Sequence, residues 1–157
     1  MEWTKEIVDG LQVMFMAMLP VIELRGAIPL GIAKGFSHMG ALFWAYTGSM
    51  IPVPFILILI RPITNWLRQT SLFRSLVERI ENKTLKKGSG TVKKYGLLGL
   101  LIFVAIPLPG TGVWSGSLLA SLLNYRFKYA FPAVAIGNLI AGFLILALSY
   151  GVLHIIS

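Results

Sequence analysis

Two ionisable residues, Glu23 and Arg25, lie one residue apart in the otherwise apolar stretch LPVIELRGAIPLG, residues 19–31. A charged group at the centre of a lipid-facing helix costs about 2.5–3.5 kcal/mol on insertion scales, so both side chains need partners or water. A carboxyl group held away from water binds a proton more readily, so Glu23 could load and release a proton. Arg25 keeps its charge and could hold a phosphate or carboxylate group. The alternative is that the two charges only neutralise each other; we favour a functional role, because charges inside a membrane usually mark a pathway.

A second group of candidate residues lies in and after IPLPGTG, residues 106–112. Two prolines and two glycines prevent regular helix here, so a new half-helix is expected to begin near residues 110–113, with free N–H groups that attract anions. Thr111 and Ser115 could add hydroxyl donors. The glycines could serve ligand contact or close packing, and Trp114 could stack on a ligand, although packing is its commoner role. The candidate residues for the substrate and proton pathway are therefore Glu23, Arg25, Gly110, Thr111, Gly112, Trp114 and Ser115.

The composition predicts that these residues belong to an all-α integral membrane protein with a single membrane domain, residues 1–157. The chain is 56% hydrophobic and only 13% charged, with a mean hydropathy of +0.78, which is too apolar for a soluble domain of this size. Residues 35–60, 95–125 and 129–157 contain no Asp, Glu, Lys or Arg. Each of these stretches exceeds the roughly 20 residues that cross a bilayer as a helix.

Two segments are predicted to be re-entrant helical hairpins, which enter the membrane and return to the same side. Residues 95–125 would form a straight helix of about 46 Å, too long for the bilayer core, and IPLPGTG breaks it at its centre. Residues 10–34 show the same form, with a break bracketed by Pro20 and Pro29 that contains Gly26. Non-helical backbone inside the membrane has N–H and C=O groups without helical partners, and it is tolerated only where it is buried in protein or lines a wet cavity. A binding site is therefore expected at these breaks.

The other segments are predicted to be two transmembrane helices and a linker. The first transmembrane helix, residues 41–61, contains Pro52 and Pro54, which should kink it. The second, residues 129–156, carries small residues that permit close helix contact, and Asn138, which we interpret as a helix-to-helix hydrogen bond. Residues 62–94 between them are predicted to be a basic, amphipathic linker helix that either lies on an anionic leaflet or packs on its own protein with a solvated charged face. Its KKGSGTVKK stretch is predicted to be a flexible hinge.

The charges predict the orientation. Nine of the fourteen basic residues lie within residues 61–94, a distribution typical of a cytoplasmic loop and not of a nucleic-acid-binding protein. If both hairpins return to their own side, Arg126 and Lys128 join the linker in the cytoplasm and both termini lie outside. The order of hairpin, span, linker, hairpin and span resembles the inverted repeats of secondary transporters.

The two motifs PVIELRGAIPLG and IPLPGTGVWSG, together with the basic linker, resemble the family of small multidrug export proteins of bacteria and archaea. The similarity covers nearly the whole chain. That family is regarded as distantly similar to the DedA superfamily, whose members have paired re-entrant hairpins and include proton-driven flippases of the polyprenyl phosphate carrier. The resemblance implies functional roles for Glu23 and Arg25. DedA relatives usually carry arginines in the second hairpin as well, and this sequence has none there.

The sequence therefore predicts a small secondary transporter of the cytoplasmic membrane, coupled to protons, that moves an amphipathic or lipid-like substrate such as a polyprenyl phosphate. One alternative is an exporter of lipophilic cationic drugs, and another is a non-transporting structural or channel-like subunit. We expect no enzyme, because no nucleophile and base accompany Glu23. No metal or cofactor is expected, since the chain has no cysteine and its two histidines are far apart. Glycine-rich helix faces predict a homodimer.

Overall fold

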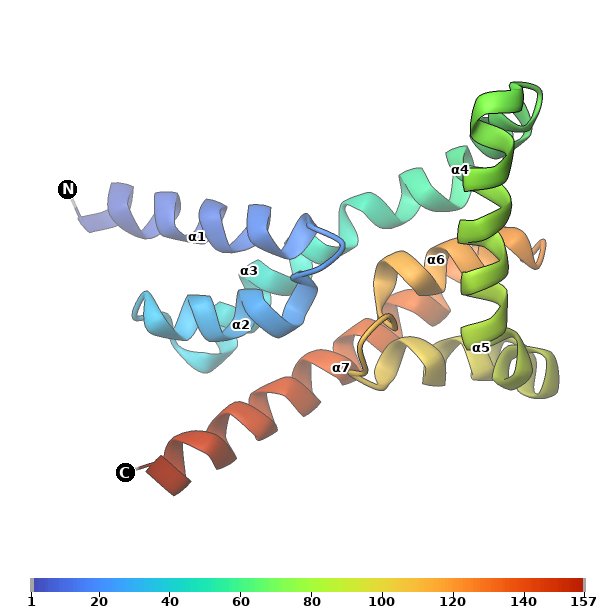
Figure 1. Ribbon diagram of the computed structural model, residues 1–157. Helices are drawn as coiled ribbons and strands as arrows, with labels where there is room; N and C mark the ends of the chain where they lie inside the picture. Colours follow the sequence, from blue (N-terminus) through green and yellow to red (C-terminus); the bar gives the residue numbers. More distant parts are fainter. Residues whose placement is uncertain (1, 157) are drawn as a thin grey trace.

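The computed structural model describes residues 2–156, and this part of the chain consists of helices joined by short turns and loops, without a β-strand (Figure 1). The all-α class is thereby confirmed. The helices, in chain order, are α1 (Glu2–Met18), α2 (Glu23–Ala33), α3 (His38–Met50), α4 (Pro52–Arg68), α5 (Ser71–Ala105), α6 (Val113–Leu122) and α7 (Phe127–Ile156).

Helices α1 and α2 form the first hairpin, joined by a turn at residues 19–22. Helix α1 begins at Glu2, well before the predicted start at residue 10. The break is also shorter than predicted, because Gly26 and Pro29 both lie inside α2. Pro29 removes one helical hydrogen bond, but the buried side chains of α2, which include Ile28, pack on the neighbouring helices and maintain the helix.

The end of α5 and helix α6 form the second hairpin. Gly96, at φ +60° and ψ −133°, divides α5 into a linker helix, residues 71–95, and a returning arm, residues 97–105. The predicted flexible hinge at residues 86–94 is wrong, since this stretch is helical. Gly88 in it is buried against Phe103 and Leu119, and this packing outweighs the poor helix propensity of glycine. The chain reverses instead at Gly96, in a conformation that suits glycine.

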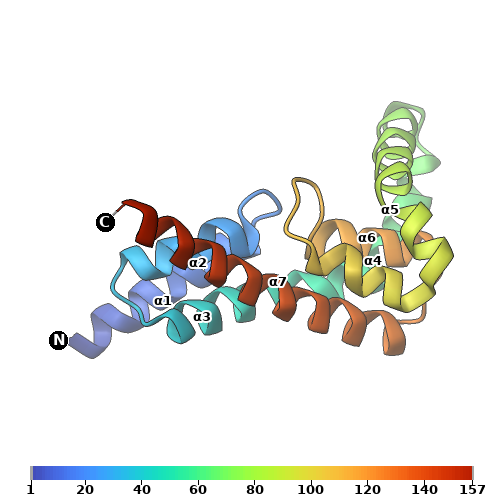
Figure 2. The same cartoon turned by 90° about the horizontal axis from the view of Figure 1, so that it is seen from below.

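The tips of the two hairpins meet at the centre of the molecule. Figures 1 and 2 show the hairpins pointing toward each other from opposite ends, with the turn at residues 19–22 beside the loop at residues 106–112 in both views. The arms that lead to these tips come from segments far apart in the sequence. Residues predicted for one site are therefore brought together by the fold.

Among the described residues, two helices are long and apolar enough to cross a membrane, and they lie where the two spans were predicted. They are His38–Arg68, formed by α3 and α4, and Phe127–Gly151 of α7. The first bends at Ile51, just before Pro52, because Pro52 and Pro54 cannot donate helical hydrogen bonds. It also extends past residue 61, so residues 62–68 continue this helix.

Each of these long helices packs on both hairpins. Helix α3 contacts α1 and α2, whereas its continuation α4 contacts α6. Helix α7 contacts the returning arm of α5 through Gly137, where an added Cβ would meet the Leu101 carbonyl oxygen at 2.6 Å. Further along α7, Gly142 lies against Leu24 and Leu42. These contacts confirm that small residues of α7 permit close approach, and they hold the two hairpins in one framework.

Helices α2 and α6, the second arms of the two hairpins, end in the same way. After α2, the Phe36 N–H donates to the Gly31 carbonyl and Gly35 adopts φ +92°. After α6, the Tyr125 N–H donates to the Ala120 carbonyl and Asn124 adopts φ +62°. Both are Schellman motifs, in which a left-handed residue closes the helix. The two hairpins therefore share their terminal geometry.

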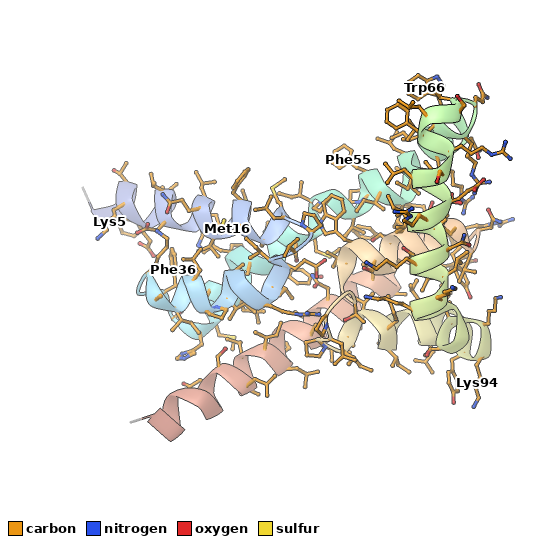
Figure 3. All side chains as sticks on the ribbon, viewed as in Figure 1. Lys5, Met16, Phe36, Phe55, Trp66 and Lys94 are labelled. Atoms are coloured by element: carbon orange, nitrogen blue, oxygen red, sulfur yellow. The ribbon has the colours of Figure 1, made fainter. Side chains whose placement is uncertain are left out.

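Charged side chains lie at both ends of the molecule, and its sides are apolar. Both termini lie at one end, with Lys5, and the linker helix with Lys94 lies at the other (Figure 3). In both ribbon views the linker helix runs across the long axis of the molecule. Large apolar side chains remain exposed along the sides, including Phe55 at 60% and Phe143 at 49% exposure. Such an apolar surface is typical of a protein that contacts lipid.

Candidate functional site at the hairpin tips

Glu23 lies where two helices begin. It is the first residue of α2 and adopts φ +45°, an uncommon left-handed conformation for a glutamate. Its carboxylate Oε1 accepts a hydrogen bond of 3.3 Å from the Trp114 N–H in the first turn of α6. The N-terminal end of each helix carries partial positive charge. The half-buried carboxylate therefore serves as the anion for the N-terminal ends of both α2 and α6.

Arg25 contacts the other hairpin and not Glu23. Its Nη2 donates to the Thr111 hydroxyl at 3.3 Å. Among the ion pairs of the described residues, none joins Arg25 to Glu23. The two charges are thus held separately, each by a group of the second hairpin, as their one-residue spacing favours.

Thr111 and Gly112 shape the loop that receives these charges. The Thr111 hydroxyl lies 2.6 Å from the Ile106 carbonyl oxygen and accepts a hydrogen bond of 3.1 Å from the Leu108 N–H. These contacts brace a loop that cannot form helix. Gly112 adopts φ +115°, and a Cβ there would collide with the Glu23 carboxylate. Gly112 therefore allows the carboxylate to reach the start of α6.

Trp114 connects the tips a third time. Its indole Nε1 donates to the carbonyl oxygen of Met18 at 2.9 Å. Met18 ends α1, where carbonyl groups have no partner within the helix, so the indole caps α1. Trp114 thus acts in the described structure as a link between hairpins.

Replacing Trp114 with phenylalanine should weaken this link while keeping an aromatic ring. Loss of one hydrogen bond to a part-buried carbonyl is expected to lower the free energy of unfolding by about 0.5–1.5 kcal/mol. Thermal unfolding of the purified protein would measure the loss. Trp66→Phe, at an exposed position on α4, is the matched control and should change little. Equal stability of the two variants would contradict a structural role for the indole N–H.

Asn138 lies beside this site, in the middle of α7. It is 3% exposed, and its amide Nδ2 donates to the Ser49 hydroxyl of α3 at 2.7 Å. This contact confirms the predicted helix-to-helix hydrogen bond. Asn138 also lines a small recess together with Glu23 and Gly112. The two long helices are therefore joined to each other close to the hairpin tips.

A cleft with a volume of about 550 Å³ extends from the tips along α2 and α7. Among the described residues that line it, Arg25 is the only one that carries a charge. The remaining lining residues are apolar except for one serine: Pro29, Ile32, Ala33, Pro107, Ile145, Leu148 and Ser149. The cleft therefore combines one fixed cation with a long apolar wall.

Comparison with known proteins gives one match, over residues 23–144, to the family described as "Putative small multi-drug export protein". The chain belongs to this family. The matched region begins at Glu23 and includes Arg25, the 106–112 loop and most of α7. No curated protein and no solved structure matched the chain. The family's description and the two long apolar helices together indicate a membrane protein of the transport class.

In this member of the family, two of the predicted site residues lie apart from the others. Gly110 and Ser115 line a separate pocket of about 180 Å³, together with Lys83 and Lys87 of the linker helix. Sequence reasoning missed both lysines. The two lysines lie near the tip of the second hairpin because the chain reverses at Gly96. The spacing of residues along the sequence does not indicate this reversal.

Arg61 is a further residue that sequence reasoning missed. Its Nε donates to the Ser121 carbonyl at 2.7 Å and its Nη2 to the Tyr125 carbonyl at 3.3 Å. These carbonyls lie at the C-terminal end of α6, which favours a cation. In this family member, Arg61 of α4 thus holds the second arm of the second hairpin from outside the site.

Proposed function

We propose that this protein is a small secondary transporter that moves an amphipathic anion across the cytoplasmic membrane together with a proton. The observation that carries the proposal is the cleft in which Arg25 is the single charged lining residue. An anionic headgroup would bind Arg25, and its apolar tail would lie along Ile32 and Leu148. A polyprenyl phosphate, the substrate implied by the resemblance to the DedA superfamily, has this chemistry.

The proposed placement has the long axis of the molecule along the membrane normal, with the hairpins re-entrant from opposite sides and their tips near the midplane. The paired Schellman motifs of α2 and α6 support an inverted repeat. The linker helix would lie on the cytoplasmic surface, since it runs across the long axis and carries seven of the fourteen basic residues. Both termini would then lie outside.

The proposed coupling follows from the charges at the tips. The ends of α2 and α6 and the Arg25 guanidinium are positive, and the Glu23 carboxylate is their counter-ion. When Glu23 binds a proton, the helix ends and Arg25 lose their counter-ion. The anionic headgroup of a substrate can then take the place of the Glu23 carboxylate. Proton and anion would therefore bind together and move in the same direction.

The family description, multi-drug export, supports a second candidate function, for which we take lipophilic cationic drugs as the substrate class. A cation would have to bind Glu23, which is the carboxylate at the tips, and would compete there with the α6 N-terminus and with protons. Such a transporter would exchange drug for proton. The direction of proton movement therefore separates the two candidates.

The test is reconstitution in liposomes with farnesyl phosphate or tetraphenylphosphonium as substrate, while internal pH is followed. We expect farnesyl phosphate to move with protons, and Arg25→Gln to lower the rate by about 10- to 100-fold, the value of one charge-assisted hydrogen bond. Arg126→Gln, at an exposed arginine near the start of α7, is the matched control. Exchange of tetraphenylphosphonium for protons, unaffected by Arg25→Gln, would contradict the proposal, and movement of neither substrate would favour a non-transporting subunit.

A further inference from the structure

The pocket of about 180 Å³ beside the second hairpin is a distinct cationic feature. It is lined by Lys83, Thr84, Lys87, Phe103, Gly110 and Ser115. Lys87 extends from the linker helix onto the tip, and a Cβ at Gly110 would collide with its Nζ. At Gly110, therefore, the Lys87 side chain of the linker helix contacts the hairpin tip.

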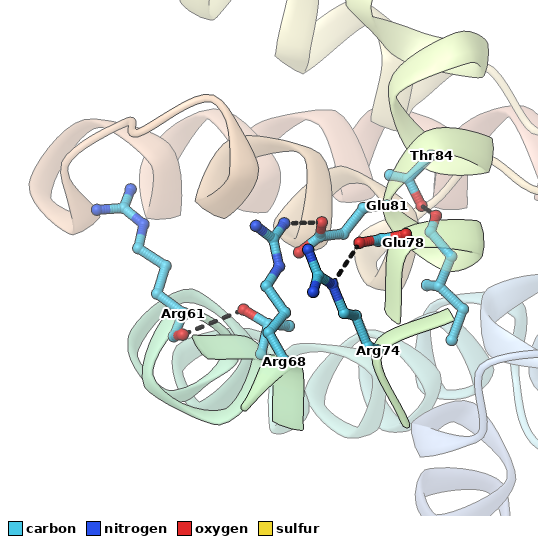
Figure 4. A network of polar contacts seen from close by, with 8 residues as sticks. Arg61, Arg68, Arg74, Glu78, Glu81 and Thr84 are labelled. Atoms are coloured by element: carbon cyan, nitrogen blue, oxygen red, sulfur yellow. Dashed lines mark hydrogen bonds and ion pairs between the residues drawn. The ribbon is translucent and has the colours of Figure 1, made fainter. Parts of the chain in front are cut away.

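The acidic residues of the linker helix do not neutralise these lysines. Arg68 forms an ion pair with Glu81, and the Arg74 Nε donates to Glu78 at 3.2 Å (Figure 4). Among the described residues, no ion pair involves Lys83 or Lys87. Two lysines, both exposed, and no acidic residue therefore line the pocket.

The other lining groups also suit an anion. Ser115 lies in the first turn of α6, where the Trp114 N–H already donates to Glu23 and the Ser115 N–H has no partner within the helix. Its hydroxyl can donate as well. Phe103 supplies an apolar wall, as a headgroup with an attached chain would require.

We propose that this pocket is a second binding site, for the phosphate group of an amphipathic phosphate monoester, reached from the side of the linker helix. The inference rests on the proposed function, because it gives the transported anion a site on the proposed cytoplasmic side. The two sites share one loop: Gly110 lines the lysine pocket, and the adjacent Thr111 binds Arg25. A headgroup held by Lys83 and Lys87 would therefore lie beside Gly110. The next residue of the loop is Thr111, whose hydroxyl contacts Arg25.

The experiment measures equilibrium binding by calorimetry, with the whole protein in nanodiscs of neutral phosphatidylcholine, so that attraction to an anionic leaflet does not contribute. The probes are hexyl phosphate, inorganic phosphate and hexyltrimethylammonium. We expect hexyl phosphate to bind, and the double variant Lys83→Gln, Lys87→Gln to weaken this binding at least about tenfold. The charge-matched double variant Lys86→Gln, Lys93→Gln, which alters lysines of the same helix outside the pocket, should bind within twofold of the unchanged protein.

The remaining outcomes distinguish free phosphate from a lipid-type phosphate monoester as the ligand, or overturn the site. Equal affinity for inorganic phosphate would identify free phosphate, and weaker binding of it would identify a lipid-type monoester. An equal loss in both double variants, no loss in either, or tighter binding of hexyltrimethylammonium would overturn the site. Because binding is measured without transport, an intact lysine site with no substrate movement in liposomes would instead count against the proposed function alone.

Discussion

Glu23→Gln is expected to abolish proton-driven transport in liposomes, with a loss of about tenfold or more in the rate of farnesyl phosphate uptake under a pH gradient. The amide oxygen of glutamine can still accept the Trp114 N–H bond that Oε1 accepts now, at 3.3 Å. The amide cannot bind or release a proton, however, and it leaves the positive helix ends and Arg25 without a counter-ion. Binding of the anion should therefore be retained or tightened while coupling is lost.

Equilibrium binding separates loss of coupling from misfolding. The Glu23→Gln variant should bind farnesyl phosphate at least as tightly as the unchanged protein, and its affinity should depend less on pH than that of the unchanged protein, with the remaining dependence due to the phosphate itself. Glu78→Gln, at an acid paired with Arg74 in the linker helix, is the control and should transport normally. Uptake by Glu23→Gln that still follows the pH gradient would exclude Glu23 as the proton carrier.

Gly112→Ala is expected to give the largest loss of stability among single methyl additions at the tips. At φ +115° an alanine is strained by about 1–3 kcal/mol. Its Cβ would also collide with the Glu23 carboxylate, which must move away from the start of α6. Overpacking of this kind costs about a further 1–3 kcal/mol. The expected result is a total loss of several kcal/mol in the free energy of unfolding, together with loss of transport.

Gly35→Ala is the matched control for this prediction. Gly35 also has a positive φ, +92°, but nothing lies within 4 Å of an added Cβ. The Gly35→Ala variant should therefore lose stability through backbone strain alone, because its added Cβ meets no other atom. Chemical denaturation of both variants would give the difference, and if the two lost the same free energy, close approach of the carboxylate to Gly112 would not matter for stability.

The second hairpin could be predicted from sequence because its signals are local. Two prolines and two glycines within residues 106–112 leave no regular helix possible, and α6 begins at Val113, as the motif indicates. The bend before Pro52 has the same local cause. Chemistry confined to a few adjacent residues determines these features, so tertiary packing has little effect on them.

Features that depend on packing could not be predicted in this way. Pro29 and Gly26 suggested a wide break, yet α2 continues through both because its buried face is held by neighbouring helices. The glycines of residues 86–94 suggested a hinge, but Gly88 is buried. That Glu23 would contact Trp114, 91 positions away, and that Lys87 would reach Gly110 follow only from the meeting of the two tips.

Because α7 and the bent α3–α4 helix each contact both hairpins, a tilt of either hairpin would also disturb its contacts with these two helices. The Asn138 Nδ2 donates to the Ser49 hydroxyl at 2.7 Å and links the two helices near their middles. In the transporter proposed above, rotation about this link would widen the gap on one side while narrowing it on the other. The proposed exchange of access would then require no unfolding of the described helices.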